Sequence, residues 1–358
     1  MSDLLTEIAS RHAVHLEGLK TGYVREFERF LKAMQDDLIG QLSRIDDPSN
    51  LTGRRLNRLL EAVRETLRAG FADYGAVWRE QIEALARYEG EFTLRALDRV
   101  ADAQFVLPTP VQLITAAFTQ PLHVEGVDGG KLLEPFYRDW TSKTFDRVTG
   151  AIRLASAQGQ STPELVRRLR GTRAARFKDG ILQQTRRDVT LMARTALQHV
   201  ASQARAEVYR QNKKYIPKEK FVAVLDGRTS VLCRSLSDRE FSQGEGPIPP
   251  LHIACRSVRV PVLDNRLRAL SDGGEQFSRG ADGKPKFVDA DLSYYEWLKT
   301  QPASFQDSVL GQTRGRLLRG GGISATRFSE LQLDKNFRAL TLDQMRELEP
   351  VAFERAGI

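Results

Sequence analysis

Two long stripes of apolar residues run through the first hundred residues of the chain. In the first stripe, apolar side chains recur at three- and four-residue spacing from Leu16 to Leu38, and in the second they recur from Leu56 to Phe92. This spacing places the apolar side chains on one face of an α-helix. The turn-forming sequence at 46–50 separates the stripes, so we predict two long helices packed as an antiparallel hairpin. Because an amphipathic helix must bury one face, both stripes favour a helical core over a ligand-binding box.

The rest of the chain divides by its local patterns. Prolines loosen the helical pattern between Leu107 and Gly130, and Ser161 followed by Pro163 and Glu164 favours a helix start. A stretch rich in Gly, Ser and Asp favours a flexible loop further on. We therefore predict an α+β fold that is mainly α. Its predicted segments are an N-terminal helical scaffold at 1–106, a connecting segment at 107–150, a domain at 151–265 that is helical at 151–215 and β-rich at 216–265, a flexible loop at 266–288, and a C-terminal helical tail at 289–358.

The β-rich unit contains both cysteines of the chain. An apolar run spans residues 221–225 and is followed by an Asp-Gly turn, and a second run of alternating apolar residues spans 257–262. Cys233, His252 and Cys255 lie between these two runs. We predict that the runs form two strands that fold against each other and make the histidine and the two thiols neighbours.

Three interpretations of this Cys/His cluster remain open from the sequence. Thiolates and an imidazole are the right ligands for a structural zinc ion, although a fourth ligand, such as Asp226, would have to be recruited. A disulfide between Cys233 and Cys255 would stabilise the fold by roughly 3 kcal/mol in the chain-entropy model, but two cysteines in 358 residues are typical of a reducing compartment. The third interpretation is that Cys233, His252 and Cys255 are packed, unliganded core residues.

Positive charge is concentrated in one part of the chain. The whole chain carries a net charge of +8, whereas residues 151–215 alone contain fourteen Lys or Arg against four Asp or Glu. A basic segment on a near-neutral body favours contact with a polyanion, although a solvated helical face is the alternative. Aromatic residues are sparse there, so we expect non-specific contacts to the phosphates of double-stranded DNA and no base stacking. The residues predicted to face phosphate are Arg167, Arg168, Arg170, Arg173, Arg176, Arg186 and Arg187.

Other classes of protein have little support. No window approaches ~18 consecutive apolar residues, so no membrane span is expected. The first residues lack the basic and apolar regions of a secretory signal, so we expect synthesis in a cytoplasm without export by a cleaved peptide.

Asp226, His252 and Cys233 could in principle form a nucleophile set. Because no catalytic motif accompanies them, we do not expect an enzyme.

Several motifs between 226 and 257 nevertheless occur in a distinctive order. Asp-Gly-Arg-Thr-Ser at 226–230 precedes Cys233 and Phe241, and Pro-Pro-Leu-His at 249–252 precedes Cys-Arg-Ser at 255–257. This order resembles the phage Mu F-like minor head protein domain, also called the phage head morphogenesis domain. The resemblance covers about 155–265, including a leading helix at 193–209. The sequence around Tyr295 to Leu298 and Gln301 to Gln306 also resembles the C-terminal part of such proteins, whereas the first hundred residues match no motif of the family.

The resemblance implies a minor structural protein of a tailed bacteriophage, present in few copies inside the capsid or at the portal vertex. Its expected partners are the portal protein, other virion head proteins and packaged DNA, with the host cytoplasm as the place of assembly. The family supplies no catalytic residue, and Cys233, His252 and Cys255 are carried over only as structural residues. Family members often have a cysteine where this chain has Ser257, which removes one thiol ligand for zinc. The alternatives are a phage-encoded nucleic-acid-processing enzyme and a zinc-stabilised DNA-binding module.

Overall fold

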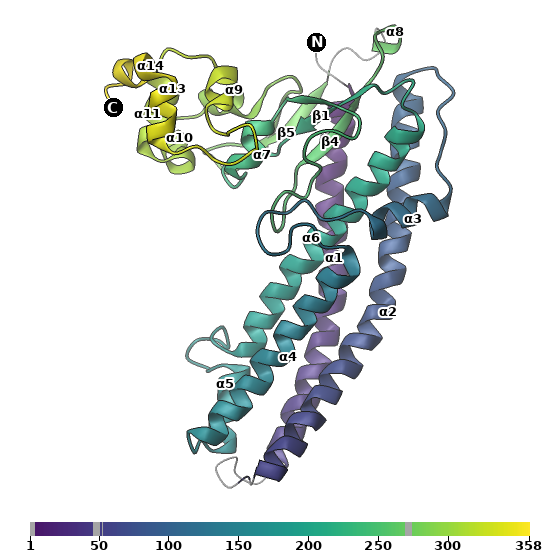
Figure 1. The fold of residues 1–358 in the computed structure, drawn as a ribbon, viewed down its shortest axis with the longest axis vertical. Coiled ribbons are helices and arrows are strands. Elements are labelled where there is room, and N and C mark those ends of the chain that lie inside the picture. Colours follow the sequence, from purple (N-terminus) through teal and green to yellow (C-terminus); the bar gives the residue numbers. More distant parts are fainter. Residues whose placement is uncertain (1–3, 46–50, 52, 269–273) are drawn as a thin grey trace.

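Four long helices form an elongated bundle, which stands upright in Figure 1. The computed structural model describes residues 4–45, 51, 53–268 and 274–358. The bundle consists of α1 (Leu4–Ser43), α2 (Gly53–Val100), α4 (Leu133–Ala157) and α6 (Ile181–Gln211). Helix α6 contacts each of the other three, so it is the central element against which the later parts of the chain are placed.

The predicted pair of long N-terminal helices is confirmed, because α1 and α2 run antiparallel and pack along their length. The predicted turn at 46–50 lies outside the described residues. The buried face of α1 differs in detail from the sequence pattern. Leu19, Tyr23 and Phe30 lie half-buried at its edge, whereas Lys20 is only 1% exposed in its centre. A charged residue therefore occupies a core position of the bundle.

The segment 107–150 is more helical than predicted. Helix α3 (Pro110–Thr119) begins at Thr109, where a capping box with Gln112 satisfies free backbone N–H groups. The proline that suggested a break instead occupies the first turn of this helix, where its missing N–H has no cost. Helix α4 runs from Leu133 to Ala157 and crosses the predicted boundary at 150.

Helix α3 is tied to α6 by a buried histidine. The Nε2 atom of His199 lies 3.1 Å from the carbonyl oxygen of Ala117, and the His199 side chain is fully buried. Burial lowers the pKa of His199 to about 4. This histidine is therefore neutral at ordinary pH and donates one hydrogen bond between the two helices.

A short helix caps the lower end of the bundle in Figure 1. Helix α5 (Thr162–Arg170) starts after Ser161, as predicted, with a capping box in which the carboxylate of Glu164 accepts from the Ser161 backbone N–H at 2.7 Å. The helix ends before Gly171, and a turn at 171–180 leads back into α6. Gly171 has φ 96, a conformation that favours glycine.

Two small sheets lie at the other end of the bundle. The first has the order β3-β1-β4, with β1 (Lys218–Val222) antiparallel to both β3 (Glu240–Ser242) and β4 (Val258–Val262). Phe221 lies opposite Arg259 in the β1–β4 pair, so the predicted pairing of the two extended runs is confirmed. Helix α7 (Val231–Leu236) lies between β2 (Leu225–Asp226) and β3 in the chain.

The predicted flexible loop at 266–288 is wrong for its described part. Strands β5 (Glu275–Arg279) and β6 (Pro285–Asp289) form an antiparallel hairpin, and β5 also pairs with β2 to complete the second sheet, β2-β5-β6. Gly280, Asp282 and Gly283, which are among the residues that suggested a loop, lie in the hairpin turn, where Gly283 has φ 66. Helix α8 (Asn265–Arg268) precedes this hairpin, and residues 269–273 lie outside the described part.

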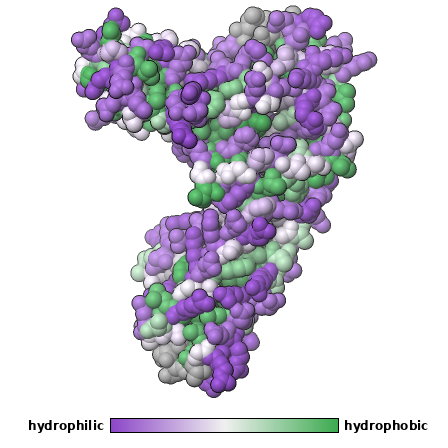
Figure 2. Space-filling view, in the orientation of Figure 1, coloured by the Kyte–Doolittle hydropathy of each residue, from purple (hydrophilic) through white to green (hydrophobic). Residues whose placement is uncertain are grey.

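The C-terminal part is helical and has its own core. Tyr294, Tyr295, Trp297, Phe328 and Phe353 are buried together at its centre. Among the described residues, no helix is both long enough and apolar enough to cross a bilayer. Hydrophilic residues cover most of the face shown in Figure 2, which is hollowed between the C-terminal helices and the lower bundle. The helices are α9 (Tyr294–Lys299), α10 (Ala303–Leu310), α11 (Gln312–Gly320), α12 (Ala325–Glu330), α13 (Leu342–Leu348) and α14 (Pro350–Arg355).

Candidate functional site

The Cys/His cluster predicted from the sequence is assembled in the structure. The ligand atoms of Cys233, His252 and Cys255 all lie within 4.8 Å of one another. Both cysteines are free and buried, and their Sγ atoms are 3.6 Å apart, well beyond the S–S bond length of about 2.05 Å. Residues separated in the chain by a helix, a strand and a loop therefore form one site.

Cys233 is placed by the start of helix α7. Ser230 caps this helix, and its hydroxyl accepts a hydrogen bond from the backbone N–H of Cys233 at 3.2 Å. The helix follows the short strand β2, so the first cysteine is held by backbone hydrogen bonds and not by a free loop.

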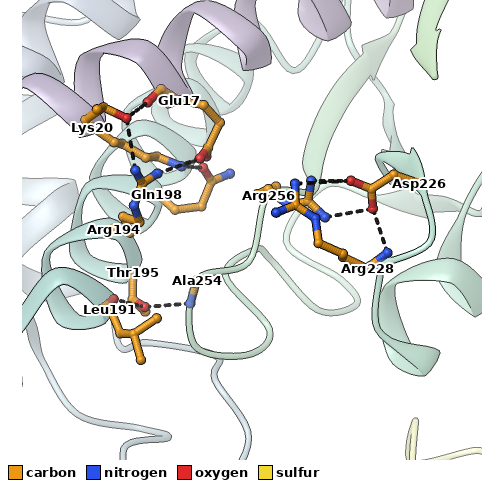
Figure 3. A network of polar contacts seen from close by, with 11 residues as sticks. Glu17, Lys20, Leu191, Arg194, Thr195, Gln198, Asp226, Arg228, Ala254 and Arg256 are labelled. Atoms are coloured by element: carbon orange, nitrogen blue, oxygen red, sulfur yellow. Dashed lines mark hydrogen bonds and ion pairs between the residues drawn. The ribbon is translucent and has the colours of Figure 1, made fainter. Parts of the chain in front are cut away.

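His252 and Cys255 lie on one tight turn before strand β4. The backbone N–H of Cys255 donates to the carbonyl of His252 at 3.1 Å, and Ala254 within the turn has φ 57. The N–H of Ala254 donates to the Thr195 hydroxyl at 2.8 Å, and that hydroxyl donates in turn to the Leu191 carbonyl of helix α6 (Figure 3). The turn is therefore anchored to the central helix of the bundle.

The hydrogen bonds of His252 define its tautomer. The Nδ1 atom lies 3.0 Å from the carbonyl oxygen of Ile253. Because a carbonyl oxygen only accepts, Nδ1 carries the hydrogen and Nε2 is the ring nitrogen left for the thiols. Burial opposes protonation of His252, but its interaction with Cys255 outweighs burial and raises the pKa of the imidazole.

The two thiols differ in their affinity for a proton. Hydrogen bonding to Cys255 and burial raise the pKa of Cys233. Burial also acts to raise the pKa of Cys255, but the hydrogen bonds from Cys233 and His252 outweigh it and lower that pKa well below its ordinary value. Cys255 is therefore the more acidic thiol of the pair.

All three residues of the cluster line one pocket of about 630 Å³. Helix α1 contributes Glu17 to its wall, helix α6 contributes Arg194, and the loop after β2 contributes Arg228. Arg228 is largely exposed, whereas Arg194 is three-quarters buried and paired with Glu17 at 2.9 Å. The cluster thus lies beside solvent-accessible space with a basic rim.

Asp226 belongs to the same unit but not to the ligand set. Its two carboxylate oxygens accept from the Arg256 guanidinium at 2.6 and 2.9 Å (Figure 3). Its Oδ1 atom also accepts from the Arg228 backbone N–H and the Thr229 hydroxyl. Burial acts to raise the pKa of Asp226, but the hydrogen bonds and charge of Arg256 outweigh it and lower that pKa. The suggestion that Asp226 is the fourth metal ligand is therefore wrong.

The pairing of Asp226 also removes the nucleophile set considered from the sequence. In such a set a carboxylate orients the imidazole, whereas here the Nδ1–H of His252 donates to the Ile253 carbonyl and Asp226 binds Arg256. A Cys–His pair remains, without an orienting acid.

Sequence reasoning missed a polar network behind the site. The ammonium group of Lys20 donates to Glu17 and to the Gln198 side chain (Figure 3). The Gln198 amide donates to the Ser257 carbonyl at 2.7 Å. Helices α1 and α6 are thereby linked to the segment that carries Cys255. The sequence signal was available, since Lys20 lies four residues after Leu16 and four before Val24, in the register of the buried face.

The arginines predicted to face phosphate lie far from this cluster. They are located on α5, on the turn at 171–180 and on the first turns of α6, at the opposite end of the bundle from the sheets (Figure 1). Two of the seven are half-buried, namely Arg168 and Arg186. The five exposed members are Arg167, Arg170, Arg173, Arg176 and Arg187.

Comparisons with known proteins find no family model that matches the chain, no similar curated protein and no similar solved structure.

Proposed function

We propose that the chain is a minor structural protein of a tailed bacteriophage head, associated with the portal and with packaged DNA. The observation that carries the proposal is the convergence of the motif residues between 226 and 257. Asp226 binds Arg256, 30 positions further along the chain, and Cys233 contacts Cys255, 22 positions further along, so the two contacts lie in one unit. This convergence supports the resemblance to the Mu F-like head proteins, whose motif order the chain shares.

The shape of the molecule supports a role in assembly. A bundle with helices of 40 and 48 residues presents long surfaces to a partner. The sheets pack against one end of this bundle, and the C-terminal helices project to the side of that end (Figure 1). We propose the portal protein and other head proteins as partners of these surfaces, and the virion as the final location.

The exposed arginines at the other end of the bundle support contact with DNA. Arg167, Arg170 and Arg173 are exposed, and Arg187 is exposed one helix further on. Confined DNA presents a dense array of phosphates, and a protein beside it gains from cations that need no particular base sequence.

Reversing the charge of four exposed arginines should weaken DNA binding. The variant combines Arg167→Glu, Arg170→Glu, Arg173→Glu and Arg187→Glu. The affinity for non-specific duplex DNA should fall at low salt, and the slope of log K against log salt should decrease by about 0.9 for each phosphate that the variant no longer neutralises. Fluorescence anisotropy at several salt concentrations measures both quantities.

A matched control reverses four exposed arginines elsewhere on the bundle, at Arg25, Arg29, Arg95 and Arg99. It should change the salt slope much less than the first variant. If the first variant and the parent have equal affinity for duplex DNA at low salt, the proposed contact of these arginines with DNA is wrong.

Co-purification tests the proposed portal contact. The chain and the portal protein of the same genome are co-expressed with a tag on the portal only, and a complex should survive gel filtration. Incubation of the purified chain with duplex DNA and Mg²⁺ should leave the DNA intact, whereas cleavage would favour the nucleic-acid-processing alternative.

A further inference from the structure

We infer that Cys233, His252 and Cys255 bind one Zn²⁺ ion through three protein ligands, with the fourth coordination position open to the adjoining pocket. The inference goes beyond the proposed function and does not depend on it, since a protein outside the virion could carry the same ion.

The separation of the two sulfur atoms fits this geometry. Two thiolates bound to one tetrahedral Zn²⁺ at about 2.3 Å lie roughly 3.8 Å apart. The observed Sγ–Sγ distance is 3.6 Å. The two cysteines therefore already have the spacing of two corners of a zinc tetrahedron.

The histidine is prepared as the third ligand. Histidines that bind metals almost always donate their other ring N–H to a carboxylate, a backbone carbonyl or a water, which fixes the ring and its tautomer. His252 has this arrangement, because its Nδ1 atom is 3.0 Å from the Ile253 carbonyl oxygen. The Nε2 lone pair is then the one available to a metal.

The protein holds both halves of the site before any ion binds. Cys233 is fixed by the Ser230 cap, and the turn carrying His252 and Cys255 is fixed by the Ala254–Thr195 hydrogen bond to α6. Preformed ligands reduce the ordering that metal binding must otherwise bring about.

The fourth position has no ligand from the described part of the chain. Within that part, the metal-ligand groups gathered here are the two cysteines and the histidine alone. All three line the pocket of about 630 Å³, and His252 is only half-buried, so an ion has a path into the site. Three protein ligands with one open position are typical of zinc sites that bind water or an exogenous ligand.

Zinc is the metal that this ligand set favours. Thiolates and imidazole together select zinc over magnesium or calcium, which prefer oxygen ligands. Arg194 on the pocket wall is paired with Glu17, whereas Arg228 is largely exposed and favours an anionic or neutral occupant of the open position over a second cation.

Elemental analysis of the full chain, purified without chelator under reducing conditions, tests the inference. The parent should carry one zinc per chain, directly or after titration with Zn²⁺. The variants Cys255→Ser and His252→Ala should each bind zinc at least 10-fold more weakly, whereas His15→Ala, which removes an exposed histidine of α1, should bind like the parent. With Co²⁺ in place of zinc, the parent should show the intense absorption of a tetrahedral thiolate complex.

Thiol labelling of the parent keeps the test independent of how well the variants fold. Zinc should protect both cysteines from alkylation, and chelation should remove the protection. A parent that neither carries nor takes up zinc would overturn the inference, as would His252→Ala binding zinc as tightly as the parent. A mass that shows a Cys233–Cys255 disulfide in protein purified under reducing conditions would also overturn it.

Discussion

Glu89→Ala should lower the free energy of unfolding by roughly 3–5 kcal/mol. Glu89 is fully buried on α2, where its carboxylate lies 2.7 Å from His12 Nε2 and 3.7 Å from Arg205 Nε. Removing the carboxylate leaves the Arg205 guanidinium, itself 6% exposed, without its acidic partner. A buried cation without a partner is far more costly than a broken ion pair on the surface. Urea denaturation followed by circular dichroism measures the change.

The control for this prediction lies two residues away on the same helix. Glu91 is 54% exposed and pairs with Arg95 at 3.4 Å, so Glu91→Ala should cost at most about 1 kcal/mol. Equal denaturation midpoints for the two variants would mean that the buried charges of α1, α2 and α6 do not depend on one another.

Asp226→Ala should destabilise the protein by a similar amount, roughly 3–5 kcal/mol. The Asp226 carboxylate is 7% exposed and binds the Arg256 guanidinium with two hydrogen bonds. Its backbone carbonyl also accepts from the Tyr294 hydroxyl at 2.8 Å, so the same residue connects the sheet to the C-terminal helices. The substitution leaves Arg256 without its acidic partner beside the Cys/His cluster. Asp36→Ala, which removes a carboxylate 64% exposed, should change stability by less than about 1 kcal/mol.

The effect of Asp226 should depend on pH. Arg256 holds the pKa of Asp226 below its ordinary value, so the carboxylate stabilises the folded state above the unfolded pKa of about 3.9. That contribution is lost as pH falls through the lower, folded-state pKa. The stability difference between the parent and Asp226→Asn should therefore be largest above about pH 4 and shrink with further acidification. A difference that grows on acidification would contradict the ion pair.

The long helices could be predicted from the sequence because the regular spacing of their apolar residues is visible without knowledge of the tertiary structure. The three- and four-residue spacing from Leu16 onward defines one face, and α1 follows it. Lys20 was missed because a charged residue is read as exposed unless its partners are known, and Gln198 comes from a helix 178 residues away. The sequence pattern does not predict helix α3 because Pro110 interrupts it, although Thr109 caps a helix in which this proline occupies the first turn.

The candidate site could be predicted in its members but not in its geometry. Cys233, His252 and Cys255 lie between two extended runs of the sequence, which predicted that the three residues are neighbours. The pairing of β1 with β4 and the proximity of the three side chains confirm this prediction. Nothing in the sequence said that Asp226 would bind Arg256 and not the cluster, because that choice depends on the turn at 226–229. The β5–β6 hairpin was missed for a similar reason, since Phe277 and Phe287 face each other only after the turn has formed.

The protein content of purified mature particles tests the proposed function most directly. Particles assembled from the genome that encodes this chain are banded in a density gradient, treated with external protease and analysed by quantitative mass spectrometry. The account predicts the chain inside the protected particles, in far fewer copies than the major shell protein and in fixed ratio to the portal. A chain abundant in the infected lysate but absent from these particles would contradict it.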